Sequence, residues 1–178
     1  MIYKNIIDKY YTHDNELKKL LIRHSADVAE KALEIVHRHP ELGADANFVK
    51  EAAMLHDIGI FTTDAKGIYC FGSDPYILHG INGGRILRNE GLEDLARVCE
   101  RHTGTGITKE QIIKRNLPMP LADYSPETIE EQIVCYADKF FSKSHPERRR
   151  TVEQTAKSLE KFGKESVERF NIWAAMFE

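Results

Sequence analysis

The chain has few cysteines, no long apolar run and no excess of basic residues. Its three cysteines, Cys70, Cys99 and Cys135, lie far apart in the sequence and form no C-x-x-C pair, so they indicate neither a disulfide framework nor a thiolate zinc site. The net charge of −3 argues against a dedicated nucleic-acid surface. No segment approaches membrane-spanning length, and the N-terminal MIYKNIIDKYY lacks the features of a signal peptide. We therefore expect a cytoplasmic protein without a membrane partner.

What is present is typical of one globular, all-α domain. Hydrophobic residues make up 42% and charged residues 30% of the 178 residues. Apolar residues recur at helical spacing, and no alternating pattern predicts strands. The expected helices cover residues 14–39, 45–57, 76–90, 93–103, 108–116, 126–143, 147–163 and 164–177. Residues 62–75 form a loop by composition, and Pro126 is expected in the first turn of its helix. We predict a single-domain helical bundle over residues 1–178.

Several ionisable residues lie on apolar helix faces, and the clearest are in the stretch AAMLHDIGIF. Here His56 and Asp57 interrupt a run of apolar residues, and a buried carboxylate needs a partner. Asp138 lies between Val134 and Phe141 on the apolar stripe of another predicted helix. Two interpretations fit these positions: helix caps or ion pairs with Arg or Lys, and ligands of a metal ion.

Three further histidines share this character. His24 precedes a small and apolar run, and His102 continues the helical stripe of Leu95, Val98 and Cys99. His79 begins HGINGGRIL, where three glycines occupy an otherwise helical segment. Each glycine costs a helix about 1 kcal/mol relative to alanine. Either another backbone or bound group comes close there, or the segment is a loose helix start.

Three features follow one another in helical segments: His24, then His56 and Asp57 within LHDIG, and then Asp138 within CYADKF. Together they resemble the HD superfamily of metal-dependent phosphohydrolases. HDIG matches the subgroup named for those letters. LHG at 78–80 and RHTGTG at 101–106 look like the two extra histidine motifs of dinuclear members, which include HD-type hydrolases of diadenosine tetraphosphate. The resemblance covers residues 24–138 and implies a helical bundle. The C-terminal helices expected in residues 147–178 lie outside it.

The resemblance also implies a ligand set. It would place one metal ion on His24, His56, Asp57 and Asp138, and a second on His79 and His102, with Asp57 bridging the two and serving catalysis. Such nitrogen and oxygen ligands suit Fe, Mn, Ni, Co or Zn. Two ions could share a hydroxide and clamp a phosphoryl group.

The substrate contacts are less defined. Thr103 and Thr105 flank His102 in a glycine-rich turn whose backbone could meet phosphate oxygens, or which only ends the helix. Lys139 follows Asp138 and could reach a phosphate or lie in solvent. Many HDIG proteins carry a lysine where this chain has Ile60, and the candidates to replace it are Lys66, Lys109 and Lys139.

These features predict a phosphohydrolase that cleaves an ester or anhydride of a small phosphorylated molecule such as a nucleotide, by metal-activated hydroxide. The alternatives are a di-iron oxygenase of the HD fold and a nucleotide-sensing module. We expect no nucleic-acid polymer as a partner. The last predicted helix has an apolar face, which either packs on the core or makes a homodimer, and we favour the core.

Overall fold

The computed structural model describes all 178 residues and consists of helices with one small hairpin. The helices are α1 (Ile2–Tyr10), α2 (Glu16–Arg38), α3 (Ala46–Leu55), α4 (His79–Asn89), α5 (Glu93–Arg101), α6 (Lys109–Arg115), α7 (Ile129–Asp138), α8 (Val152–Leu159) and α9 (Lys164–Phe177). The hairpin strands are β1 (Asp64–Ala65) and β2 (Cys70–Phe71), which pair antiparallel. The all-α prediction is confirmed. None of the helices has the length and apolarity needed to cross a bilayer.

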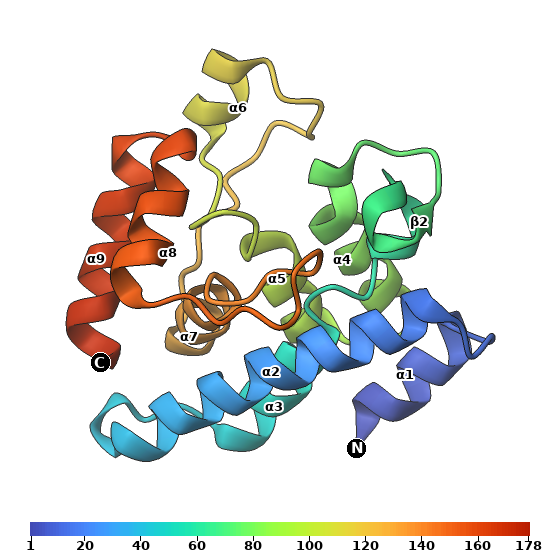
Figure 1. The fold of residues 1–178 in the computed structure, drawn as a ribbon, viewed down its shortest axis with the longest axis horizontal. Coiled ribbons are helices and arrows are strands. Elements are labelled where there is room, and N and C mark those ends of the chain that lie inside the picture. Colours follow the sequence, from blue (N-terminus) through green and yellow to red (C-terminus); the bar gives the residue numbers. More distant parts are fainter.

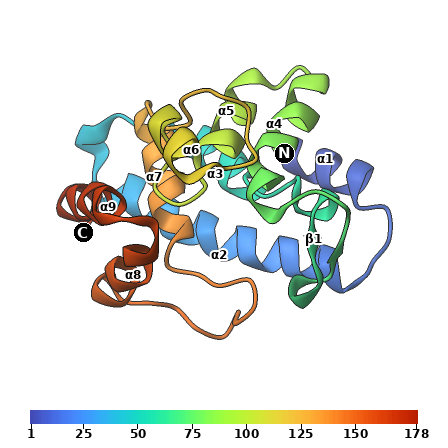
Figure 2. The same ribbon diagram turned by 90° about the horizontal axis from the view of Figure 1, so that it is seen from above.

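The long helix α2 organises the arrangement. It packs along α3 and against α7, while α4 and α5 form a second closely packed pair (Figure 1). Helices α8 and α9 stand at one end of the molecule, and the hairpin lies at the opposite end in both views (Figure 2). Between these two ends lie the segment after α3, the start of α4, and the ends of α5 and α7.

One large apolar core joins these elements. It contains 33 buried residues and includes the apolar face of α9. In α9, Phe170 and Phe177 are fully buried, and the ring of Phe170 stacks on Tyr136 of α7 at a centroid distance of 4.9 Å. The prediction that this helix packs on the core is confirmed.

The start of α7 differs from the sequence prediction. Pro126 lies before the helix rather than in its first turn, because Thr128 is the N-cap and α7 begins at Ile129. The Thr128 hydroxyl accepts from the amide of Glu131, and the Glu131 carboxylate accepts in return from the amide of Thr128. This capping box satisfies the free amides of the first turn. The helix also ends earlier than predicted, at Asp138.

Two elements were not predicted. Helix α1 precedes the first predicted helix, and Ile6 and Ile7 bury its apolar side. The hairpin falls within the predicted loop of residues 62–75. Strands of two residues are too short to show an alternating pattern, so periodicity could not reveal them.

The glycines of α4 confirm that another backbone comes close. A methyl group on Gly80 would collide with the Cys99 carbonyl of α5. A methyl group on Gly59, the glycine of the HDIG stretch, would collide with the backbone of His79 and Gly83. These contacts bring the start of α4 against both the turn after α3 and the end of α5.

Candidate metal centre

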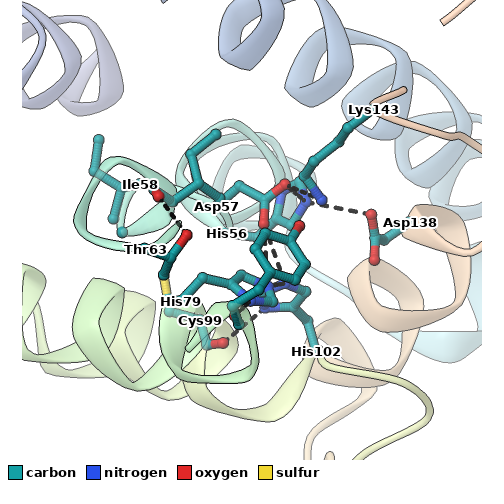
Figure 3. A network of polar contacts seen from close by, with 12 residues as sticks. His56, Asp57, Ile58, Thr63, His79, Cys99, His102, Asp138 and Lys143 are labelled. Carbon is teal, nitrogen blue, oxygen red and sulfur yellow. Dashed lines mark hydrogen bonds and ion pairs between the residues drawn. The ribbon is translucent and has the colours of Figure 1, made fainter. Parts of the chain in front are cut away.

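Five helical elements deliver six buried ionisable side chains to one place. Figure 3 labels all of them except His24. The residues are His24 within α2, His56 and Asp57 directly after α3, His79 at the start of α4, His102 directly after α5, and Asp138 at the end of α7. They form two groups that could each hold a metal ion. One group is His24, His56, Asp57 and Asp138, and the other is Asp57, His79 and His102. The structure thus brings together every residue of the predicted ligand set, in the predicted grouping.

Asp57 is common to both groups, and its two oxygens face different partners. Its Oδ2 lies 3.2 Å from Nε2 of His24 and 3.2 Å from Nε2 of His56. Its Oδ1 lies 3.4 Å from Nε2 of His79 and 3.3 Å from Nε2 of His102. On the first side Asp138 adds its Oδ1, 3.0 Å from Nε2 of His24. This is the arrangement that a bridging carboxylate requires.

Backbone contacts set the tautomers of three imidazoles. The Nδ1 atoms of His56, His79 and His102 lie 2.6, 2.7 and 2.7 Å from the carbonyl oxygens of Ala53, Tyr76 and Cys99, respectively. A carbonyl can only accept, so each Nδ1 carries a proton and Nε2 is the ring nitrogen that faces the site. The Nε2 atoms of His79 and His102 are 3.0 Å apart. Two lone pairs at that distance repel one another unless a cation or a proton lies with them.

The remaining polar atoms of the site also suit a metal. Oδ1 of Asp57 and Nε2 of His56 are buried without a hydrogen-bond partner. Buried polar groups are normally satisfied, and each exception needs an explanation. Imidazole nitrogens and carboxylate oxygens are ligands for divalent transition metals. The residues present therefore fit divalent metal ions.

Lys143 is the cation that the sequence analysis did not identify. Its Nζ lies 2.6 Å from Oδ2 of Asp57, and its side chain is 13% exposed. Lys66 and Lys109, two proposed replacements for the lysine missing at Ile60, are exposed. Lys143 follows α7 in the segment KFFSKS, where no periodicity indicates which lysine turns inward.

The site is electrostatically coupled. Burial would raise the pKa of the Asp57 carboxyl, but Lys143 and His56 hold it well below its usual range. Burial would likewise lower the pKa of His56, whereas the Asp57 and Asp138 carboxylates raise it to about 9. Burial, together with the neighbouring His102, lowers the pKa of His79 to about 3. The carboxylate side thus attracts positive charge, while the His79 side holds neutral imidazoles.

The three predicted substrate contacts lie in different surroundings. Lys139 is not a solvated lysine: its ammonium lies 2.5 Å from Oδ2 of Asp138 and donates to the His102 carbonyl at 2.9 Å. Thr103 lines a cavity beside His79. Thr105 is fully buried, and its carbonyl accepts from Arg169 at 2.6 Å. Thr103 is therefore the best placed of the three to meet a ligand.

Two cavities border the centre from different sides. One of about 210 Å³ is bordered by His79 and Thr103 and has an apolar wall of Tyr76, Ile77, Ile107 and Phe162. The Tyr76 ring stacks on the His79 imidazole at a centroid distance of 4.5 Å. The other cavity, of about 250 Å³, is mostly polar and is bordered by His24 and Lys143.

Comparisons with known proteins identify relatives of two kinds. The tRNA (cytidine(56)-2'-O)-methyltransferase of Thermoplasma volcanium is 37% identical over 146 residues, which cover 82% of this chain and 38% of the relative. The protein of the same name from Picrophilus torridus is 40% identical over 69% of this chain and 32% of the relative. An uncharacterized protein of Methanocaldococcus jannaschii is 38% identical over 66% of this chain and 64% of the relative. The chain thus spans only about a third of the two methyltransferases.

A solved structure and a family model were also matched. The crystal structure of the HD domain of the L. monocytogenes phosphodiesterase PgpH has 17% sequence identity and a TM-score of 0.48, over 89% of this chain and 94% of that one. The family model described as "HD domain" matches residues 21–142, a range that includes all six clustered residues. This chain therefore belongs to the HD domain family.

Proposed function

We propose that the protein is a metal-dependent phosphohydrolase that cleaves a phosphate ester or anhydride of a small phosphorylated molecule, with nucleotides as the first class to test. The observation that carries the proposal is the Asp57 carboxylate, whose two buried oxygens face two separate groups of histidines. Membership of the HD domain family supports phosphohydrolase chemistry in general. We further propose that residues 1–178 act as one HD-type domain.

In this proposal the six clustered residues hold two divalent ions. His24, His56, Asp57 and Asp138 would hold one, and Asp57, His79 and His102 the other. When bound, such ions lower the pKa of water and neutralise charge on phosphoryl oxygens. The backbone carbonyls behind three of the histidines keep their rings oriented, and Asp57 ties both halves of the site to the turn after α3.

The apolar cavity suits the organic part of the substrate. Tyr76 and Ile107 give it an apolar wall, and Thr103 offers a hydroxyl beside His79. Aromatic and aliphatic walls with a few polar groups are typical of sites that bind small molecules. A nucleobase or a comparable ring would fit this description, and the phosphate would then lie over the metal ligands.

A second candidate concerns RNA. The names of two relatives refer to tRNA, so an RNA phosphate is an alternative substrate even though the sequence analysis predicts no nucleic-acid partner. The methyl transfer in those names belongs to proteins of which this chain spans about a third. An RNA substrate would require strongly salt-dependent binding, since phosphate contacts release counterions.

The test begins with metal content and continues with phosphate release. Purified protein would be analysed for bound metals, loaded with Mn, Fe or Zn, and assayed on mononucleotides, dinucleoside polyphosphates and tRNA. Wild type should release phosphate, and His56→Ala should abolish the release and lower the metal content, since His56 belongs to one of the two metal groups. His37→Ala is the matched control, because His37 is exposed on α2 and lies outside both metal groups. Oxygen uptake by the iron-loaded protein without phosphate release would replace the proposal with the oxygenase alternative.

A further inference from the structure

The polar cavity beside His24 has features that the metal centre alone does not explain. Residues Glu16, Lys19, Leu20, Arg23, His24 and Asp27 border it, and they follow the spacing of a single face of α2. Its opposite wall comes from residues 142–144 and Pro146, which follow α7. The face of α2 that supplies the predicted ligand His24 thus continues outward as a charged wall.

Charges of both signs border this cavity. Three cations, Lys19, Arg23 and Lys143, border it together with the carboxylates of Glu16 and Asp27. The Glu16 carboxylate already pairs with Lys19 at 3.2 Å. Arg23 has no carboxylate partner and donates only to the Pro146 carbonyl, at 3.3 Å. A guanidinium in this situation can still offer several donors to an anion.

Lys143 links the cavity to the metal centre. Its ammonium is mostly buried and lies against Oδ2 of Asp57, the oxygen that faces His24 and His56. If Asp57 bridges divalent ions, their charge neutralises the carboxylate with which Lys143 pairs. A buried ammonium then needs another anion. Arg23 borders the same cavity as Lys143 and could supply donors to such an anion.

We propose that Arg23 and Lys143, assisted by Lys19, form a subsite that binds a second phosphate group next to the one attacked at the metal centre. The subsite rests on the proposed phosphohydrolase function and narrows its substrate to molecules with a chain of two or more phosphates. The phosphate chain would extend from the metal centre past Lys143 into the polar cavity, while the organic group occupies the apolar cavity at His79.

The experiment compares two non-reacting probes on the Mn-loaded protein. Isothermal titration calorimetry would measure binding of methylenediphosphonate, which cannot be hydrolysed, and of orthophosphate. Wild type should bind methylenediphosphonate more tightly. Arg23→Met should weaken its binding by about tenfold or more, as expected for a lost charge-assisted hydrogen bond, and should leave orthophosphate binding and metal content nearly unchanged.

Two further variants make the test specific. Arg38→Met removes one charge from the same helix outside the cavity and should leave the preference for methylenediphosphonate intact. Lys143→Met should bind methylenediphosphonate no more tightly than orthophosphate. Its metal content, measured in parallel, shows whether the metal ligands still bind Mn. Equal affinity of wild type for both probes, or equal effects of Arg23→Met and Arg38→Met, would overturn the subsite.

The design separates the subsite from the proposed function, because binding needs no turnover. If binding of methylenediphosphonate is preferred and depends on Arg23, but no substrate releases phosphate, the subsite proposal stands and the phosphohydrolase proposal is rejected. Release of phosphate that is indifferent to Arg23 would reject the subsite and retain the hydrolase.

Discussion

Replacing Gly59 with alanine tests how the fold positions half of the candidate metal centre. A methyl carbon at Gly59 would lie 2.9 Å from Cα of Gly83 and even closer to the His79 carbonyl and the Gly83 amide. Relaxed contacts between carbon atoms are about 3.5–4.0 Å. The turn after α3 and the start of α4 would therefore have to separate by roughly 1 Å. Since both obstacles are backbone, no side-chain rotation can relieve the collision.

The expected consequences concern both stability and metal binding. Overpacking typically costs about 1–3 kcal/mol, and we expect the upper end here because two backbones must move. For a chain of this length that corresponds to a decrease in melting temperature of roughly 6–12 °C. His79 begins α4, so its imidazole moves away from Asp57, and the group of Asp57, His79 and His102 should bind metal more weakly than the other group.

Thermal unfolding and elemental analysis of Gly59→Ala would measure these effects. Gly67→Ala is the matched control, because a methyl group there meets no atom within 4 Å. The control should keep its metal content and change stability by no more than about 0.5 kcal/mol. A Gly59→Ala protein with the melting temperature and metal content of wild type would refute the close approach of α4 as the device that positions His79.

Three further perturbations test other parts of the structure. Asp57→Ala should remove bound metal and lower the melting temperature of the metal-loaded protein, because both ligand groups share this carboxylate; retained metal and activity would contradict that role. Phe170→Ala should cost about 3–5 kcal/mol in urea unfolding, since the ring is fully buried against α7, and a loss below about 1 kcal/mol would show that α9 contributes little to the core. Burial would raise the pKa of Glu178, but hydrogen bonds from Lys31 and Tyr136 hold it below the usual 4.5. The ionised Glu178 carboxylate therefore stabilises the fold fully above its unfolded pKa of 4.5. This stabilisation is lost as the pH falls through the lower pKa that Glu178 has in the folded protein. Glu178→Gln should be less stable than wild type at neutral pH and should approach it in acid, and a pH-independent difference would exclude the linkage.

Helix content was predictable where a long apolar stripe was present. The predicted helix over residues 164–177 coincides with α9, and the one over 14–39 exceeds α2 by a few residues. Boundaries failed where local hydrogen bonds decide them. At α7 the capping box of Thr128 and Glu131 places the helix start after Pro126, and the T-x-x-E pattern was the signal that could have shown it.

The clustering of the six residues could be anticipated from their order and residue type through a family resemblance, and the structure gathers them into two groups that share Asp57. Lys143 could not be anticipated in this way. Its position depends on how the segment after α7 folds back, with the Arg150 amide donating to the Phe140 carbonyl at 2.9 Å. Lys139, a candidate phosphate contact, lies against Asp138 and donates to the His102 carbonyl.

By itself, the sequence determined the helical class, the identity of the histidines and aspartates on apolar faces, and the unusual number of glycines in HGINGGRIL. These properties follow from periodicity, residue chemistry and steric size, which act locally along the chain. Only the tertiary structure decided which oxygen of Asp57 faces which histidines, that Lys143 is the cation beside it, and that a polar and an apolar cavity border the site. The reason is that these relations join residues far apart in the chain, such as His24 and Asp138, which are separated by 114 positions and meet only because α2 packs against α7.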